Sequence, residues 1–212
     1  MNPDMQVVKQ VLAGDTEAFR YLVDRHRNKL FGVLMRILAD PQVAEEVAQD
    51  TFVKAYTRLE GFRGEASFST WLIQIGVHQA RDRHRSLRRQ ESAGIVSLDE
   101  LRLRNESGWE PADGRQVADP LANLINKEKW EHYEAELAGI PADFREVFTL
   151  RHLENMDYGE ISRITGDSPG TLKVRVHRAR ALLKARMEAR GIKLGNSTAA
   201  PTARLVRKQE GS

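Results

Sequence analysis

Two runs of basic side chains give this sequence its clearest capacity for chemistry, which is the binding of phosphate groups. Residues 81–90 hold five arginines against one acidic residue, and residues 171–190 hold seven basic residues against one. Between them, residues 91–120 reverse the sign, with seven acidic residues against three arginines. Two basic segments separated by an acidic one indicate two contacts with a single polyanion, such as a nucleic acid.

The second basic run has the pattern of an amphipathic helix with its own start signal. Asp167 or Ser168 can accept hydrogen bonds from the first free backbone N–H groups, and Pro169 suits the first helical turn. Apolar residues recur with the spacing of one buried face at Leu172, Val176, Ala179 and Leu183. The other faces carry Lys173, Arg175, Arg178, Arg180, Lys184 and Arg186.

A short helical segment and a glycine turn stand directly before this helix. Residues 158–165 place Ile161 and Ile164 inward, and Gly166 follows where a tight turn needs a residue that tolerates positive φ. This order is the helix-turn-helix plan, whose second helix enters the major groove of DNA. An ordinary pair of antiparallel helices with a solvated basic face gives the same local pattern.

The pattern of the first ninety residues predicts three amphipathic helices, at about residues 15–39, 41–59 and 68–90. Asp40 and Pro41 separate the first two, because proline cannot continue one helix but fits the opening turn of the next. The second helix leaves exposed a polar ridge of Glu45, Glu46, Gln49 and Asp50. A solvated face is the simpler explanation of this ridge, and a surface for a basic partner protein is the alternative.

A loop with two glycines, at residues 61–67, precedes the third helix. Phe68 and Trp71 open that helix, ahead of its arginine cluster. Aromatic rings beside basic side chains suit single-stranded nucleic acid, because bases stack on the rings while arginines hold the backbone. We expect Trp71 to be a core anchor, so the loop before it is better placed to meet an extruded base.

The whole pattern predicts an all-α protein of two small helical domains joined by a flexible acidic linker. The first domain covers residues 1–90, the linker residues 91–125, and the second domain residues 126–191 with the helix-turn-helix. Helices are expected at about residues 121–137 and from Pro141 onward. Residues 192–212 show no helical stripe and are expected to form a mobile tail.

Other residue types exclude several classes of function. The lack of cysteine excludes disulfides and thiolate metal sites and fits a reducing cytoplasm. Because no apolar run reaches bilayer length and the N-terminus lacks a signal-peptide pattern, we expect a soluble cytoplasmic protein without membrane insertion. The six histidines are scattered, and His132 near Glu136 is weak evidence for a metal site. We expect no enzyme activity, no cofactor and no metal ion.

Seven short motifs, divided between the two predicted domains, carry a resemblance to a known family. The first domain contains GDTEAF at residues 14–19, AEEVAQDTF at 44–52 and FSTWL at 68–72. The second contains IPADFREVF at 140–148, LR at 150–151, YGEI at 158–161 and GTLKVRVHRAR at 170–180. In this order the motifs resemble the sigma factors of bacterial RNA polymerase, and more narrowly the extracytoplasmic-function (ECF) group of the sigma-70 family.

The resemblance implies that the first domain binds the polymerase clamp helices and captures an unpaired base of the promoter minus-ten element. The second domain would read the minus-thirty-five element as duplex and sit on the polymerase flap. The implied polymerase-binding residues are Glu46, Gln49 and Asp50. Those implied for minus-ten DNA are Arg63, Ser67, Phe68, Thr70, Trp71, His78, Arg81 and Arg85. Those implied for minus-thirty-five DNA are Thr171, Lys173, Val174, Arg175, His177 and Arg178.

The function implied is that of an alternative sigma factor in a stress or signal response. Its implied partners are bacterial core RNA polymerase, promoter DNA and an anti-sigma factor, which in this group is often membrane-bound. The acidic linker would thread through channels that later hold RNA. The alternative function is a helix-turn-helix regulator that acts as a dimer without polymerase. It predicts tight duplex binding by the isolated protein and a dimerising apolar face, and the sequence has no surplus face of that kind.

Three positions depart from the family pattern. His78 stands where asparagine is common, so minus-ten contacts can differ and protonation offers a route to pH sensitivity. A partly buried His78 without DNA contact is the alternative. Val174 replaces a common serine, which trades a hydroxyl for contact with a thymine methyl group. Pro169 stands one position later than in the frequent arrangement. The promoter sequence therefore cannot be copied from relatives.

Overall fold

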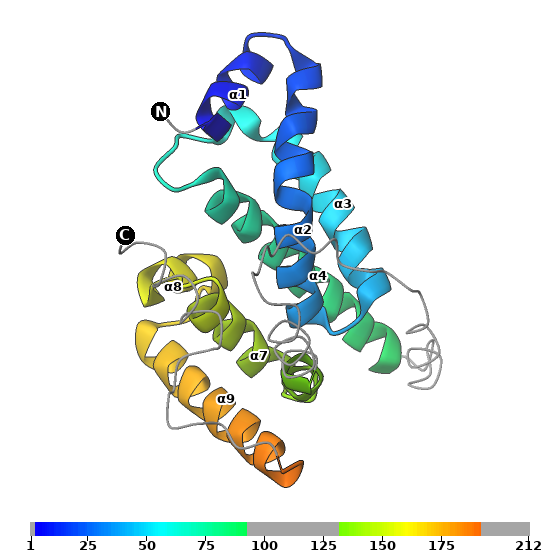
Figure 1. Cartoon of the computed structure of the whole chain (residues 1–212), viewed down its shortest axis with the longest axis vertical. Coiled ribbons are helices and arrows are strands. Elements are labelled where there is room, and N and C mark those ends of the chain that lie inside the picture. Colours follow the sequence, from blue (N-terminus) through cyan, green and yellow to red (C-terminus); the bar gives the residue numbers. More distant parts are fainter. Residues whose placement is uncertain (1–2, 93–131, 192–212) are drawn as a thin grey trace, which may run out of the picture. The chain divides into compact units, whose positions relative to one another are not determined.

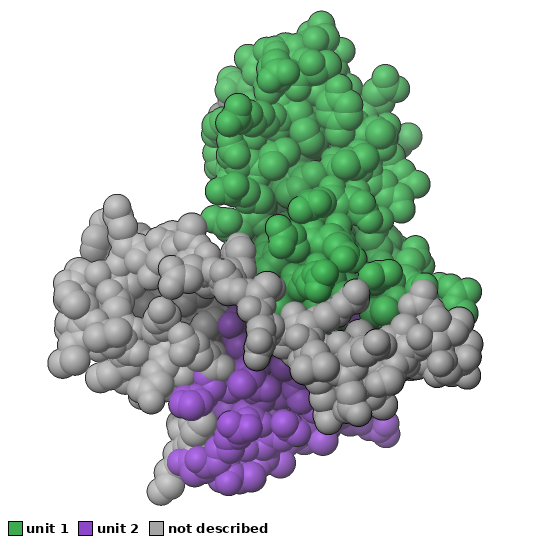
Figure 2. Space-filling view, turned by 90° about the vertical axis from the view of Figure 1, so that its right-hand side faces the viewer, with its two compact units in different colours: residues 1–114 green, residues 115–212 purple. Residues whose placement is uncertain are grey.

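The computed structural model describes residues 3–92 and 132–191, and every regular element in these ranges is helical (Figure 1). This confirms the predicted all-α fold. The chain divides into two compact units, residues 1–114 and 115–212 (Figure 2). Residues 93–125 of the predicted linker and the predicted tail at 192–212 lie outside the described residues. None of the helices in the described ranges has the length and apolar composition of a membrane span.

The first unit contains, in its described part, four α-helices and two short 3-10 helices. They are α1 (Pro3–Leu12), η1 (Thr16–Ala18), α2 (Phe19–Leu38), α3 (Pro41–Thr57), η2 (Leu59–Gly61) and α4 (Phe68–Ser92). The helices α2, α3 and α4 agree with the three predicted helices to within a few residues. Helix α1 was not predicted, and it packs against α2, η1 and η2.

Local chemistry sets the boundary between α2 and α3, as the sequence predicts. Helix α2 ends at Leu38, and Ala39 caps it with a left-handed φ of 57° and an N–H that donates to the Met35 carbonyl at 2.8 Å. Asp40 then caps α3 by accepting a hydrogen bond from the N–H of Val43 at 3.0 Å, and Pro41 occupies the first turn. Both ends thus satisfy backbone groups that a helix terminus otherwise leaves unpaired.

A buried apolar core holds α2, α3 and α4 against one another (Figure 1). Leu22, Leu30 and Leu34 of α2 and Leu72 of α4 are almost completely buried. Gly76 brings α4 close to its neighbours, because a β-carbon there would lie only 3.0 Å from Leu30 Cδ1. Each buried leucine contributes about 1.5–3 kcal/mol. The core therefore gives α3 and α4, which carry most of the predicted site residues, a rigid support.

The second unit is described from residue 132 onward. It contains a helical segment at residues 132–138, α7 (Ala142–Phe148), the π-helix η4 (Thr149–Leu153), α8 (Tyr158–Thr165) and α9 (Pro169–Ala189). Helix α7 follows Pro141, and α8 and α9 begin where the sequence predicts. The π-helix was not predicted. Residues 121–131 of the expected helix at 121–137 lie outside the described residues.

Helix α9 is anchored at both ends. Its predicted stripe of Leu172, Val176, Ala179 and Leu183 is confirmed, because all four side chains are buried. Near its C-terminus, Arg186 Nε donates to Glu136 Oε2 at 2.9 Å, and Arg190 pairs with the other oxygen of the same carboxylate. Glu136 is only 2% exposed. Its carboxylate therefore ties α9 to the segment 132–138, and its oxygens are engaged by arginines.

Candidate nucleic-acid interface

Caps and a glycine turn build the predicted helix-turn-helix. At the start of α8, the Glu160 N–H donates to Asp157 Oδ1 at 2.7 Å and the Asp157 N–H donates to Glu160 Oε2 at 2.8 Å. Gly166 ends α8 with a φ of 75°, a conformation that glycine adopts without strain. Ser168 then caps α9 by accepting from the Thr171 N–H at 3.2 Å. Of the two predicted caps, Ser168 is the one used.

Arg175 is held against the turn of the helix-turn-helix. Its Nη1 donates to Asp167 Oδ2 at 2.6 Å, and both side chains are 24% exposed. The carbonyl of Asp167 also accepts from the Ser162 hydroxyl at 2.8 Å. The guanidinium thus links α9 to the turn and to α8, in contrast with the other predicted residues of this helix.

The first turns of α9 present the other predicted minus-thirty-five residues to solvent. The exposed side chains are those of Thr171, Lys173, Val174, His177 and Arg178. Lys173 Nζ lies 5.9 Å from the centre of the Tyr158 ring, and Arg151 Cζ lies 5.1 Å from the same ring. Both cations therefore lie against the Tyr158 ring, and two neighbouring positive charges favour binding of phosphate.

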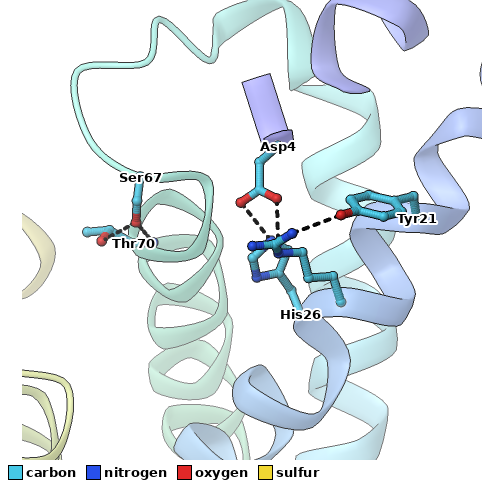
Figure 3. Close-up of polar contacts among 6 residues, drawn as sticks. Asp4, Tyr21, His26, Ser67 and Thr70 are labelled. Atoms are coloured by element: carbon cyan, nitrogen blue, oxygen red, sulfur yellow. Dashed lines mark hydrogen bonds and ion pairs between the residues drawn. The ribbon is translucent and has the colours of Figure 1, made fainter. Parts of the chain in front are cut away.

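The loop at residues 62–67 leads into α4 and exposes several of the predicted minus-ten residues. Arg63 and Ser67 are exposed, and Gly64 has a φ of 73°. Ser67 caps α4, because its hydroxyl accepts from the Thr70 N–H at 3.0 Å and lies 2.9 Å from Thr70 Oγ1 (Figure 3). The cap fixes the direction in which loop 62–67 leaves the helix.

Three aromatic rings cluster at the two ends of this loop. The ring centres of Phe62 and Trp71 are 5.1 Å apart, those of Phe62 and Phe68 are 5.6 Å apart, and those of Phe68 and Trp71 are 5.7 Å apart. Phe68 is 0% exposed, whereas Trp71 is partly exposed. Phe68 is therefore buried in this cluster. Trp71 shares the core role expected for it with Phe62 and Phe68.

Farther along α4, three predicted residues share one side of the helix at i, i+3 and i+7 spacing. His78 and Arg85 are exposed, and Arg81 is partly buried. Arg85 Nη1 lies 3.5 Å from Asp82 Oδ1, a distance typical of a weak surface ion pair. The exposure of His78 excludes the alternative of a partly buried histidine, and its contact with DNA stays a prediction.

The predicted polymerase-binding residues lie on the exposed side of α3. Glu46, Gln49 and Asp50 are all exposed, and Glu46 Oε2 accepts a hydrogen bond from Arg83 Nη2 of α4 at 3.0 Å. One turn beyond them are two exposed apolar side chains, Val53 at 65% and Tyr56 at 41%. The sequence reasoning did not select Val53 or Tyr56, although an exposed apolar pair beside polar residues is typical of a protein-binding surface.

Comparison with known proteins assigns the chain to a family. Residues 22–90 match the family Sigma-70 region 2, and residues 133–183 match the family Sigma-70, region 4. The RNA polymerase sigma-H factor of Pseudomonas aeruginosa is 30% identical over 84% of this chain and 90% of that protein. The ECF RNA polymerase sigma-E factor of Haemophilus influenzae is 31% identical over 87% of this chain and 95% of that protein. The chain belongs to the ECF sigma factors of the sigma-70 family.

Solved structures of sigma factors share the fold of this chain. A sigma factor RpoE from Bartonella quintana, in complex with the anti-sigma factor NepR, has a TM-score of 0.60 at 22% identity and covers 80% of this chain and 96% of its own. CnrH in complex with the cytosolic domain of CnrY has a TM-score of 0.55 at 25% identity, covering 89% and 99%. As an ECF sigma factor, this protein directs promoter-specific initiation of transcription.

The N-terminal helix α1 of this sigma factor lies outside the family match. The region 2 match begins at residue 22, so α1 precedes it. Helix α1 nevertheless contains the buried Asp4, which contacts His26 of α2. Sequence reasoning counted His26 among scattered histidines and did not select Asp4, because an acidic residue near a chain terminus gives no signal of burial.

Proposed function

We propose that this ECF sigma factor binds core RNA polymerase through α3 and binds promoter DNA through loop 62–67, α4 and α9, and that it catalyses no reaction itself. The observation that carries the proposal is the first half of α9. There, a fully buried stripe lies opposite five exposed side chains, two of them cationic, on a helix capped at Ser168. The exposed side chains can therefore contact base edges and phosphates when the helix lies in a major groove.

The surface proposed to bind polymerase consists of five exposed side chains on α3, those of Glu46, Gln49, Asp50, Val53 and Tyr56. Its exposed apolar pair can be buried by a partner, while the neighbouring polar residues set orientation. Glu46 belongs to the same surface, although its hydrogen bond to Arg83 already gives it a role in joining α3 to α4. We therefore expect Gln49 and Asp50 to be more sensitive to substitution than Glu46 in polymerase binding.

The two DNA surfaces are proposed to read different forms of the promoter. Loop 62–67 exposes Arg63 and Ser67 above an aromatic cluster, a setting suited to an unpaired base and its backbone. Helix α9 is suited to duplex, because a single helix fits the major groove. Val174, half exposed at 50%, is placed for apolar contact with a thymine methyl group.

We further propose that a regulatory anti-sigma protein covers these surfaces in the cytoplasm, where polymerase and promoter DNA are found. The support is that the two similar structures are complexes, one with an anti-sigma factor and one with the cytosolic domain of CnrY. A competitor of this kind would bury the exposed apolar pair of α3. An inducing signal would then act by releasing the sigma factor.

In vitro transcription with purified bacterial core polymerase, on fragments of the protein's own genome, tests the function. We expect new start sites only when the protein is added. Gln49→Ala should reduce initiation at least about 10-fold by weakening polymerase binding, and Arg178→Ala should do so by weakening promoter binding. The matched controls are Gln42→Ala on α3 and Lys184→Ala on α9, which remove an exposed amide and an exposed cation from the same two helices.

One result would replace the proposal with the alternative function. Core polymerase would neither bind the protein nor start at new sites, while the isolated protein would shift duplex DNA as a dimer. Sedimentation of the free protein, with and without a promoter duplex, distinguishes that regulator from a sigma factor that needs polymerase.

A further inference from the structure

A buried acid connects α1 to α2. Asp4 is 6% exposed, its Oδ2 lies 3.0 Å from His26 Nε2, and its Oδ1 lies 3.3 Å from Arg25 Nε (Figure 3). Arg25 in turn donates to the Tyr21 hydroxyl at 2.8 Å. Burial lowers the pKa of His26, which fits a neutral ring that donates its Nε2 hydrogen to the carboxylate. A buried carboxylate is stable only with such partners. The directional contacts of Asp4 with His26 and Arg25 therefore fix the position of α1, in addition to its apolar contacts.

From His26 the contact continues to both ends of loop 62–67. The His26 ring centre lies 5.2 Å from that of Phe68, the first residue of α4. Phe68 packs edge-on against Phe62, the first residue of the loop. Both ends of the loop therefore pack in one buried aromatic cluster. Asp4 holds the His26 ring, which contacts this cluster through Phe68.

A second contact joins α1 to the middle of the same loop. A β-carbon at Gly64 would overlap Met5 Cε, so the loop backbone lies directly on the Met5 side chain. Gly64 also has a φ of 73°, where a residue with a β-carbon is strained. Helix α1 thus supports the loop through Met5 at its centre and through Asp4, by way of His26, at its ends.

We propose that α1 positions loop 62–67 for capture of an unpaired promoter base, with Asp4 as the positioning residue. The inference rests on the proposed role of the loop in base capture. A loop that is already held in its bound shape loses little conformational freedom when the base enters, and that raises affinity without any new contact. Asp4 and Met5 themselves touch no DNA in this mechanism.

The test uses holoenzyme reconstituted from the full chain and core polymerase, bound to fluorescent promoter DNA with a pre-melted minus-ten element. An abasic site is first moved along the unpaired strand with the wild-type protein. The captured position is the one where loss of the base weakens binding about 10-fold. The same intact and abasic promoters are then bound by Asp4→Ala, and by Gln6→Ala as a control on the exposed side of α1.

We expect Asp4→Ala to weaken binding of the intact promoter about 10-fold and to leave binding of the abasic promoter within about 2-fold of wild type, because the variant has lost only base capture. Gln6→Ala should match wild type on both. Equal weakening on both promoters, or no weakening on either, would overturn the inference, since general destabilisation does not depend on one base.

A second variant and the result for the wild-type protein cover the cases in which Asp4→Ala alone does not decide. If Asp4→Ala does not fold, Met5→Ala decides, because it removes the contact with Gly64 and leaves the buried charges intact. It should weaken binding of the intact promoter about 3-fold and spare the abasic one. If no abasic site affects the wild-type protein, loop 62–67 captures no base, and the proposed function of the loop fails independently of α1.

Discussion

At the scale of single residues, the ion pair between Asp167 and Arg175 separates two roles that a basic residue of a DNA-reading helix can have. A free guanidinium contacts phosphate or a base edge, whereas a paired one braces the protein. The short distance of 2.6 Å and the equal, low exposure of the two side chains favour the brace. The family resemblance placed Arg175 with the DNA-contacting residues, because the sequence does not show where Asp167 points.

Substitution of the acid distinguishes these roles. We expect Asp167→Ala to weaken holoenzyme binding to the minus-thirty-five duplex about 3- to 10-fold, because Arg175 loses the group that holds it and the turn loosens. Thermal unfolding should show a loss of about 1 kcal/mol. Fluorescence anisotropy measures the binding, and Asp143→Ala, at an exposed acid of the same unit, is the control. Tighter binding after Asp167→Ala would instead mean that the released Arg175 reaches the DNA.

At the scale of helices, the sequence predicted helix boundaries best where capping residues and proline set them locally. Asp40 and Pro41, and Ser168 and Pro169, mark helix starts because their side chains and fixed φ act within one turn. Helix α1 was not predicted, because Asp4 interrupts its apolar pattern. The burial of Asp4 depends on a contact with His26, which is remote in sequence. The π-helix η4 was also not predicted, since an extra residue in a helical turn is stabilised by tertiary packing and has no sequence signature.

We expect His152 of the π-helix to make the second unit sensitive to acid. Its His152 packs on Phe148 with ring centres 4.8 Å apart, and burial, together with the charges of Arg180 and Arg151, lowers the pKa of His152 to about 4. Between the ordinary pKa near 6.5 and this value, the unfolded chain binds more protons than the folded one. Stability contributed by neutral His152 is therefore present above pH 6.5 and is lost as the pH falls toward 4.

Hydrogen exchange of full-length protein at pH 7 and pH 5 checks this effect. We expect protection of residues 142–190 to fall at pH 5 in the wild-type protein, and to fall less in His152→Leu, which has no proton to gain at that position. His177→Leu, at an exposed histidine of the same unit, is the matched control and should behave as wild type. Equal losses in all three proteins would show that other groups set the acid sensitivity of the unit.

At the scale of the whole molecule, the sequence already indicated two nucleic-acid contacts from its alternation of charge, and the family match assigns one sigma region to each unit. Charge alternation could be read from the sequence because it needs no tertiary information. The brace at Arg175, the burial of Phe68 and the role of α1 could not, since each depends on which side chains meet across the fold. The remaining question is whether both units contact the same promoter at once.

The salt dependence of binding answers that question, because the number of counterions released grows with the number of phosphate contacts. For holoenzyme on a pre-melted promoter, we expect Lys173→Ala to reduce the slope of log affinity against log salt by about 0.9, and Arg63→Ala to reduce it by about 0.7, since Arg63 meets single-stranded DNA. The double variant should lose about 1.6 if both units bind one promoter. Val174→Ser, which changes no charge, should keep the slope and alter sequence preference alone. A slope that changes with only one of the two cations would mean that the other unit is held away from the DNA in the complex.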